Sequence, residues 1–169
     1  NSVGGTVTSF LMAVDPRIVC AAPSCYLSSL RETARNVGAQ DAEQNVFNQL
    51  GFGLNHAGLA LLGGNAVRIH ASFEDFFPIA GTYSTYELVP NVDKKCGIDA
   101  KRYGITDVLG RHGWKESTRV SSIQWMQRWL AGDRSLPEID VSALRKLDVG
   151  FDIKKVDAGL NGKANNVTP

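Results

Sequence analysis

The sequence predicts an α/β protein whose parallel sheet is flanked by helices, and two observations lead to this fold class. First, three short apolar runs at 18–22, 66–72 and 103–109 are typical of strands buried in a parallel sheet. Second, loops and helix-like segments separate these runs, as expected for the alternation of parallel strands and helices. Because three strands leave the edges of a sheet uncovered, we expect the sheet to be incomplete in this chain.

Helices are predicted around these strands. Residues 3–14 form an amphipathic run that ends at Asp15 and Pro16, because proline cannot continue a helix. Further helical segments are predicted at 26–36, 41–50, 79–89 and 116–130. Asp41 suits the N-cap of the segment 41–50. One face of that segment is apolar and consists of Val46, Phe47 and Leu50. Residues 90–100 are expected to form a polar connection.

The segment 116–130 gives the strongest helical pattern. Its apolar stripe consists of Val120, Ile123, Met126 and Leu130, which predicts that this face packs inward. Gly132 follows the segment and suits the end of a helix. We therefore expect residues 1–132 to form the folded domain portion, and the more polar residues 133–169 to form a partly ordered extension on the surface.

The composition is that of an ordinary globular domain. The 169 residues are 43% hydrophobic and 21% charged, with a formal net charge of +1. Such a charge argues against a nucleic-acid partner, which a basic surface would attract. No run approaches the roughly 18 apolar residues that a membrane helix needs, so no membrane partner is expected. The first residues lack the features of a signal peptide, and the sequence leaves the cellular compartment open.

The first residues carry the most informative motif. Ser2, Val3 and Gly4 form a Ser-x-Gly unit that leads directly into the helix predicted at 3–14. This unit is the downstream half of a nucleophile elbow, the strained strand-to-helix turn that presents a serine hydroxyl. The upstream glycine of the motif would precede Asn1. We therefore expect the chain to start within the motif and to lack the N-terminal strands of the sheet.

Two later residues could complete a serine hydrolase site. A serine nucleophile needs a base that takes its proton and a carboxylate that orients the base. Asp75 follows the strand predicted at 66–72, and His112 follows the strand predicted at 103–109. The spacings are 73 residues (75 − 2) and 37 residues (112 − 75). The order serine, aspartate, histidine and the positions after strands fit the α/β-hydrolase arrangement of the triad.

Each of these residues also has a purely structural interpretation. Ser2 could be an ordinary residue near a helix start, and His112 an ordinary loop residue. Asp75 could cap a helix, in which case its neighbour Glu74 could be the acid. His70 lies inside a predicted strand and is interpreted as a core histidine. The joint occurrence of the three candidates in the right order favours the hydrolase interpretation.

No metal or cofactor site is predicted. The histidines are scattered, paired cysteine spacings are absent, and there is no phosphate loop or dinucleotide fingerprint. The cysteines Cys20, Cys25 and Cys96 are interpreted as buried or incidental thiols. A Cys20–Cys25 or Cys25–Cys96 disulfide is the alternative for an exported protein, and the sequence does not decide between these possibilities.

Several segments together resemble the acetyl xylan esterase-like α/β-hydrolases of bacteria. The matching segments are 1–6 (NSVGGT), 11–18 (LMAVDPRI), 21–26 (AAPSCY), 40–45 (QDAEQN), 75–77 (DFF), 112–113 (HG) and 125–130 (WMQRWL). They follow one another in order over about residues 1–131. The resemblance implies that residues 1–132 are the C-terminal portion of an α/β-hydrolase fold that starts at the nucleophile elbow.

The resemblance also implies roles for individual residues. Ser2 would be the nucleophile, Asp75 the triad acid and His112 the general base, and no cofactor is implied. The backbone N–H of Val3 would donate one hydrogen bond to the oxyanion. The family usually has glycine where Val3 stands; the N–H donor survives this change, but the β-branched side chain narrows the pocket. The second oxyanion donor would come from a loop outside this chain.

We therefore expect a serine carboxylic ester hydrolase, with deacetylation of a plant polysaccharide as the implied reaction. One alternative is a catalytically inactive fragment or one chain of an obligate complex, because the sheet is expected to be incomplete. A second alternative is a serine peptidase, since the same fold and triad also cleave amides. The expected partners are a small-molecule or carbohydrate ester and, to complete the sheet, a homo-oligomer or a separate N-terminal half.

Overall fold

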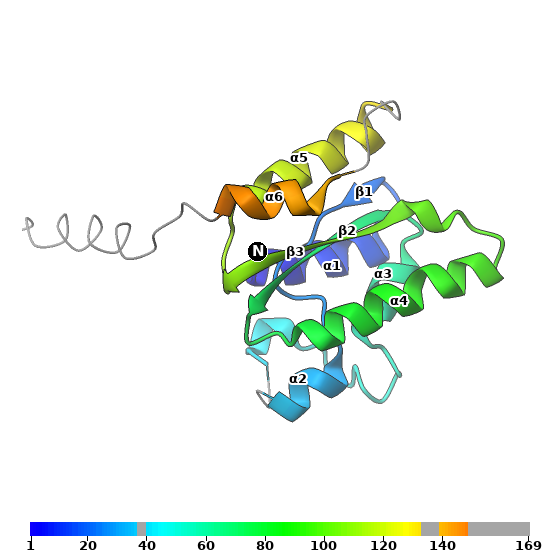
Figure 1. Ribbon diagram of the computed structural model, residues 1–169. Helices are drawn as coiled ribbons and strands as arrows, with labels where there is room; N and C mark the ends of the chain where they lie inside the picture. Colours follow the sequence, from blue (N-terminus) through cyan, green and yellow to red (C-terminus); the bar gives the residue numbers. More distant parts are fainter. Residues whose placement is uncertain (37–39, 133–138, 149–169) are drawn as a thin grey trace, which may run out of the picture.

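A computed structural model describes residues 1–36, 40–132 and 139–148 of the chain. One parallel sheet contains β1 (Cys20–Ala21), β2 (Ala66–Glu74) and β3 (Tyr103–Arg111), in this order. The helices are α1 (Val3–Val14), α2 (Leu30–Asn36), α3 (His56–Leu62), α4 (Ile79–Lys95), α5 (Glu116–Leu130) and α6 (Val141–Asp148), and the short 3₁₀ helices are η1 (Ala42–Gln44) and η2 (Ala100–Arg102). Figure 1 shows α5 and α6 on one face of the sheet, with α1, α3 and α4 on the other.

The core forms on both faces of the central strand β2. Val67 and Ile69 are completely buried in the cluster that contains Met12 of α1 and Leu59 of α3. On the opposite face, Ala66 packs in a smaller cluster with Trp125 of α5. A strand buried on both faces reads as a continuous run rather than as an apolar–polar alternation, which is why the run 66–72 predicted a parallel strand.

Helix α5 has the predicted bounds, but it packs through a different face. Its buried residues are Ser117, Thr118, Ser121 and Trp125, whereas Ile123 and Leu130 of the predicted stripe are exposed. Polar side chains on β2 and β3 explain why this other face of α5 packs inward. Arg68 Nε donates to Thr106 Oγ1 at 2.8 Å, and the Thr106 hydroxyl lies 2.7 Å from Ser121 Oγ. Because buried polar side chains must be hydrogen-bonded, the polar face of α5 turns inward to meet them.

Helix α4 continues past Pro90, where the sequence predicted a polar connection. The segment after Pro90 is held by a buried ion pair, in which Asp93 Oδ2 accepts from Arg102 Nε at 2.6 Å and from a second guanidinium nitrogen at 2.5 Å. Val89, the residue before the proline, is also buried. Tertiary contacts therefore outweigh the cost of a proline within a helix, which is about 3 kcal/mol.

The prediction of a helix at 41–50 is wrong. Only the single turn η1 (Ala42–Gln44) is helical, and the residues after it form turns. Asn48 adopts a left-handed conformation with φ 58°, and Phe47 is 95% exposed. The Asn45 side chain competes with helical bonding, because its amide donates to the carbonyls of Gln40 and Asp41.

Part of the polar C-terminal region is folded. Helix α6 (Val141–Asp148) buries Leu144, and Arg145 forms an ion pair with Asp107 of β3. Residues 133–138 and 149–169, which belong to the predicted extension, lie outside the described residues. Among the described residues, the structure contains no helix with the length and hydropathy needed to span a bilayer.

Two buried histidines predict that the protein loses stability in mild acid. Burial lowers the pKa of His56 to about 4, and burial together with the charge of Arg68 lowers the pKa of His70 to about 3. An unfolded histidine titrates near 6.5, so above that pH both states are neutral and the protein keeps its full stability. As the pH falls from there towards 4, the unfolded state binds protons that the folded state does not, and stability is lost. Between pH 7 and pH 5 the loss should be about 2 kcal/mol per histidine.

Urea unfolding at pH 7 and pH 5 measures this effect. His56→Gln should reduce the loss between pH 7 and pH 5 by about 2 kcal/mol, whatever it does to the stability at pH 7, because one of the two buried rings is gone. A free energy of unfolding that stays constant between these pH values would contradict the assignment of neutral, buried rings.

Candidate active site

The register of the sheet brings Asp75 and His112 to the same place. Strands β2 and β3 are paired in parallel, and at their ends Glu74 lies opposite Arg111. Asp75 and His112 are the next residues of the two segments, so both leave the sheet at its carboxyl edge. The spacing of 37 residues noted in the sequence is therefore the spacing of two paired positions on neighbouring strands.

The two side chains form a hydrogen-bonded pair. His112 Nδ1 lies 2.9 Å from Asp75 Oδ1 and 3.0 Å from Oδ2. The carboxylate side chain is only 1% exposed, and its Oδ1 also accepts from the backbone N–H of Phe77 at 3.0 Å. Glu74, the alternative acid, is exposed and makes no such contact. An ionised carboxylate can only accept hydrogen bonds, so in a neutral imidazole this pairing places the proton on Nδ1 and leaves a lone pair on Nε2.

The imidazole is further held by an aromatic ring. Phe76 stacks on His112 with ring centroids 4.5 Å apart and an interplanar angle of 24°. The His112 side chain nevertheless keeps 22% of its surface exposed, so its outer edge can reach a bound molecule. A fixed ring plane, an oriented ring and a partly exposed side chain are what a general base requires.

Ser2 occupies a strained turn at the start of α1. Its backbone angles are φ 53° and ψ −122°, a conformation that L residues rarely adopt and that costs about 1–3 kcal/mol. Backbone bonds hold the turn, because Ser2 N–H donates to the Ser24 carbonyl at 3.0 Å and the Ser2 carbonyl accepts from Thr6 N–H at 2.9 Å. The side chain makes no capping bond. The Ser2 hydroxyl is therefore not used to cap the helix, and the backbone holds the strained turn that carries it.

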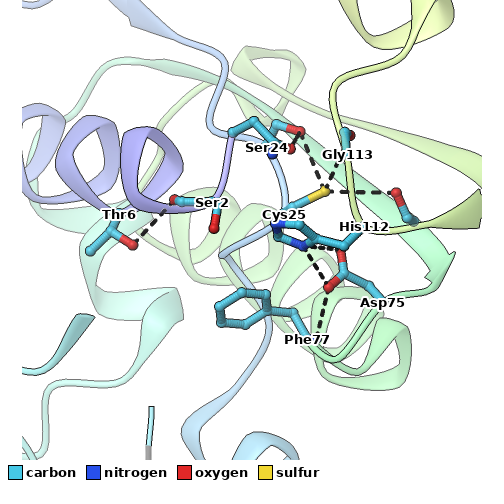
Figure 2. A network of polar contacts seen from close by, with 10 residues as sticks. Ser2, Thr6, Ser24, Cys25, Asp75, Phe77, His112 and Gly113 are labelled. Atoms are coloured by element: carbon cyan, nitrogen blue, oxygen red, sulfur yellow. Dashed lines mark hydrogen bonds and ion pairs between the residues drawn. The ribbon is translucent and has the colours of Figure 1, made fainter. Parts of the chain in front are cut away.

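A short series of contacts links this turn to the histidine. Ser24, which anchors Ser2, places its hydroxyl 3.6 Å from Cys25 Sγ, and the thiol in turn lies within 4.8 Å of ligand atoms of both Asp75 and His112. Figure 2 shows the Ser2 side chain on the side of the His112 ring that is turned away from Asp75. Within the part of the chain that the structure describes, no hydrogen bond joins Ser2 to His112.

Val3 supplies a backbone donor beside the serine. It is the first residue of α1, and N–H groups in the first turn have no carbonyl of their own helix to bond. The positive end of the helix dipole adds to the attraction for a negative oxygen. The Val3 side chain is 46% exposed. The backbone N–H of Val3 can therefore donate a hydrogen bond to a negatively charged oxygen beside Ser2.

Cys25 is the feature that the sequence did not reveal. It was interpreted as a buried or incidental thiol, and the structure buries it to 2% exposure between the turn of Ser24 and the Asp75–His112 pair. Burial raises the pKa of the thiol. Its one sequence signal is its place three residues after the apolar run 18–22, which predicts a position near the carboxyl edge of the sheet. All three cysteines are free thiols, with Cys20 buried and Cys96 exposed, so the alternative disulfides are absent.

Two adjacent glycines in α1 give a matched pair of predictions for the elbow. A Cβ atom on Gly5 would lie 2.3 Å from the Ser24 carbonyl oxygen, whereas one on Gly4 would meet nothing within 4 Å. Gly5→Ala should therefore push α1 away from the loop that anchors Ser2, lower the stability by about 1–3 kcal/mol and reduce activity. Gly4→Ala should be neutral or stabilising by up to about 1 kcal/mol.

Thermal unfolding of both variants, together with any ester hydrolysis, checks this pair. Equal effects of the two alanines on the melting temperature would contradict the close approach of α1 to Ser24.

Comparisons with known proteins agree with this architecture. No protein-family model and no curated protein matches the sequence. Among solved structures, the chain is similar to a carbohydrate esterase family 15 glucuronoyl esterase from Caldicellulosiruptor kristjansonii, with a TM-score of 0.62 and 16% sequence identity. The match covers 82% of this chain and 45% of the esterase, so the chain spans about half the length of that protein. The predicted fold class is confirmed: a parallel sheet flanked by helices that matches part of an α/β-hydrolase.

Proposed function

We propose that the protein is a serine carboxylic ester hydrolase in which Ser2, His112 and Asp75 act together. One observation carries the proposal: a buried aspartate orients a partly exposed histidine, and Figure 2 shows a serine on a strained helix-start turn on the other side of that ring. The pair alone would also fit a structural ion pair. The strain at Ser2 supports the catalytic interpretation, because strained non-glycine residues cluster at active sites.

The geometry suggests how the residues would divide the chemistry. Ser2 Oγ attacks the ester carbonyl carbon while its proton passes to His112 Nε2, and Asp75 stabilises the resulting imidazolium. The negative oxygen of the tetrahedral intermediate accepts a hydrogen bond from Val3 N–H. As the intermediate collapses, the imidazolium gives its proton to the leaving alcohol. Water, activated by His112, then cleaves the acyl–serine ester and releases the acid.

The substrate class is proposed from two likenesses. The sequence segments quoted above resemble acetyl xylan esterase-like hydrolases, and the fold is similar to a structure described as a carbohydrate esterase. Both point to an ester carried by a carbohydrate, and the first points to an acetyl group. We therefore propose an acetylated polysaccharide or a small acetyl ester as the substrate.

A matched pair of chromogenic substrates tests the reaction class. We expect the protein to hydrolyse p-nitrophenyl acetate and to leave the corresponding amide, p-nitroacetanilide, untouched. Cleavage of the amide at a comparable kcat/KM would favour a serine peptidase instead. Failure to hydrolyse either substrate, by protein that is shown to be folded by circular dichroism, would contradict an active esterase.

One further observation favours a second candidate, in which this chain is one part of an obligate complex. Helix α1 exposes an apolar stripe at helical spacing, made of Val3, Val7, Leu11 and Val14. An exposed stripe of this kind often marks a protein interface. Sedimentation of the protein over a range of concentrations tests this candidate: we expect association, and an active monomer at all concentrations would contradict it.

A further inference from the structure

Three residues with metal-binding side chains meet at one place, and the proposed catalytic histidine is one of them. Cys25 comes from the loop after β1, Asp75 from the end of β2 and His112 from the end of β3. One sulfur, one carboxylate oxygen and one ring nitrogen lie within 4.8 Å of one another. The esterase mechanism uses Asp75 and His112 but leaves Cys25 without a role.

The thiol is held in place by its surroundings. Cys25 has φ 53°, and its N–H donates to the His70 carbonyl at 2.9 Å, which fixes the backbone. Its sulfur contacts Ser72 Oγ and the Gly113 carbonyl, both at 3.7 Å. Figure 2 shows the sulfur between the segment of Ser24 and that of Gly113, next to the imidazole. These contacts hold the sulfur at a place where it lies within 4.8 Å of ligand atoms of Asp75 and His112.

The donor set matches one class of ion in charge and in chemistry. A thiolate and a carboxylate carry two negative charges, and a neutral imidazole carries none, so together they balance a divalent cation in a buried site. Thiolate and imidazole are ligands that zinc and cadmium favour, whereas magnesium and calcium prefer oxygen ligands. Three protein ligands with a fourth open position are a common zinc arrangement. We propose that Cys25, Asp75 and His112 bind one thiophilic divalent cation, such as Zn²⁺, and that the bound ion switches the esterase off.

The inhibition follows from where the protons of the site move when the ion binds. The inhibition, unlike the binding of the ion, rests on the proposed function. The available ring nitrogen is Nδ1, which faces Asp75 and carries the proton in the metal-free protein. When the ion binds Nδ1, that proton moves to Nε2, and the thiol proton leaves to solvent. An Nε2 that carries a proton cannot accept the proton of Ser2. The metal-bound protein would therefore lack its general base.

Cadmium binding tests the site without any need for activity. We would titrate the protein with Cd²⁺ alone and follow the cadmium–thiolate charge-transfer absorption. The background should carry Cys20→Ala and Cys96→Ser, because Cys20 Sγ lies 3.2 Å from the Met126 sulfur and forms a competing pair of soft donors, and Cys96 is exposed. We expect one Cd²⁺ per chain in this background.

Single substitutions then identify the ligands. Loss of a direct ligand should weaken binding at least as much as loss of an outer partner, which costs about 10–100-fold. We expect Cys25→Ser to abolish the absorption, and Asp75→Asn and His112→Ala each to raise the dissociation constant by about 10-fold or more. Absence of the absorption in the background protein, its persistence in Cys25→Ser, or unchanged affinity in both other variants would overturn the site.

Activity separates the two proposals. In the same background, Zn²⁺ should inhibit hydrolysis of p-nitrophenyl acetate, and the residual activity of Cys25→Ser should be insensitive to it. If Cd²⁺ binds as expected but the metal-free protein hydrolyses no ester, the proposed function fails and the metal site stands. If the metal-free protein is active and Zn²⁺ binds without inhibiting it, the switch is overturned.

Discussion

Replacing Ser2 with alanine is expected to abolish ester hydrolysis, with kcat falling by about 10⁴-fold or more. The fold should survive, because the turn is held by the backbone N–H and carbonyl of Ser2 and the side chain makes no capping bond. Alanine also has to adopt the same φ of 53°, so the strain at this position is unchanged. The substitution therefore removes the nucleophile and little else.

Steady-state hydrolysis of p-nitrophenyl acetate measures this loss, with Ser84→Ala as the matched control. Ser84 is exposed on α4, and its hydroxyl donates to the Ala80 carbonyl of the same helix. The control should keep the parent kcat and melting temperature. Ester hydrolysis that persists in Ser2→Ala at the parent rate would show that another group performs the chemistry.

Replacing Asp75 with asparagine is expected to lower kcat by about 10³–10⁴-fold. The amide oxygen can still accept the Phe77 N–H, so the local turn should remain. The amide nitrogen, however, is a donor, and facing His112 Nδ1 it favours the tautomer that carries the proton on Nε2. That tautomer cannot take the proton of Ser2, so the effect should fall on kcat more than on KM.

Asp140→Asn is the control for this substitution, because among the described residues the Asp140 carboxylate accepts bonds from backbone N–H groups alone, at the start of α6. It should leave kcat and KM unchanged. Since an imidazole without its orienting carboxylate stays weak as a base at every pH, raising the pH should not restore Asp75→Asn to the parent rate. Full recovery at high pH would contradict the proposed role of Asp75 in fixing the tautomer.

Local sequence signals were enough to predict the parallel sheet and two helices. Helix α1 has the predicted bounds because Asp15 and Pro16 end it. Helix α5 has the predicted bounds because a long amphipathic run predicts its extent and Gly132 predicts its end. Asp75 and His112 could also be placed, because residues after parallel strands gather at one edge of the sheet. These features depend on neighbours in sequence or on a general property of sheets.

The features that the sequence missed depend on contacts between distant segments. Helix α4 continues past Pro90 because Asp93 forms an ion pair with Arg102. Helix α5 buries its polar face because Thr106 forms a hydrogen bond with Ser121. The position of Cys25 beside His112 requires three segments, from β1, β2 and β3, to meet. Neither hydrophobic periodicity nor the spacing of cysteines carries this information.

Covalent labelling with a fluorophosphonate probe tests the central claim most directly, because the probe reacts with a serine only when a neighbouring base activates it. Intact-mass and peptide analysis of the labelled protein should show one adduct, located on Ser2. Labelling should be absent in Ser2→Ala and much slower in Asp75→Asn. A folded protein that leaves Ser2 unlabelled, or that carries the adduct on another residue, would contradict a catalytic site made of Ser2, His112 and Asp75.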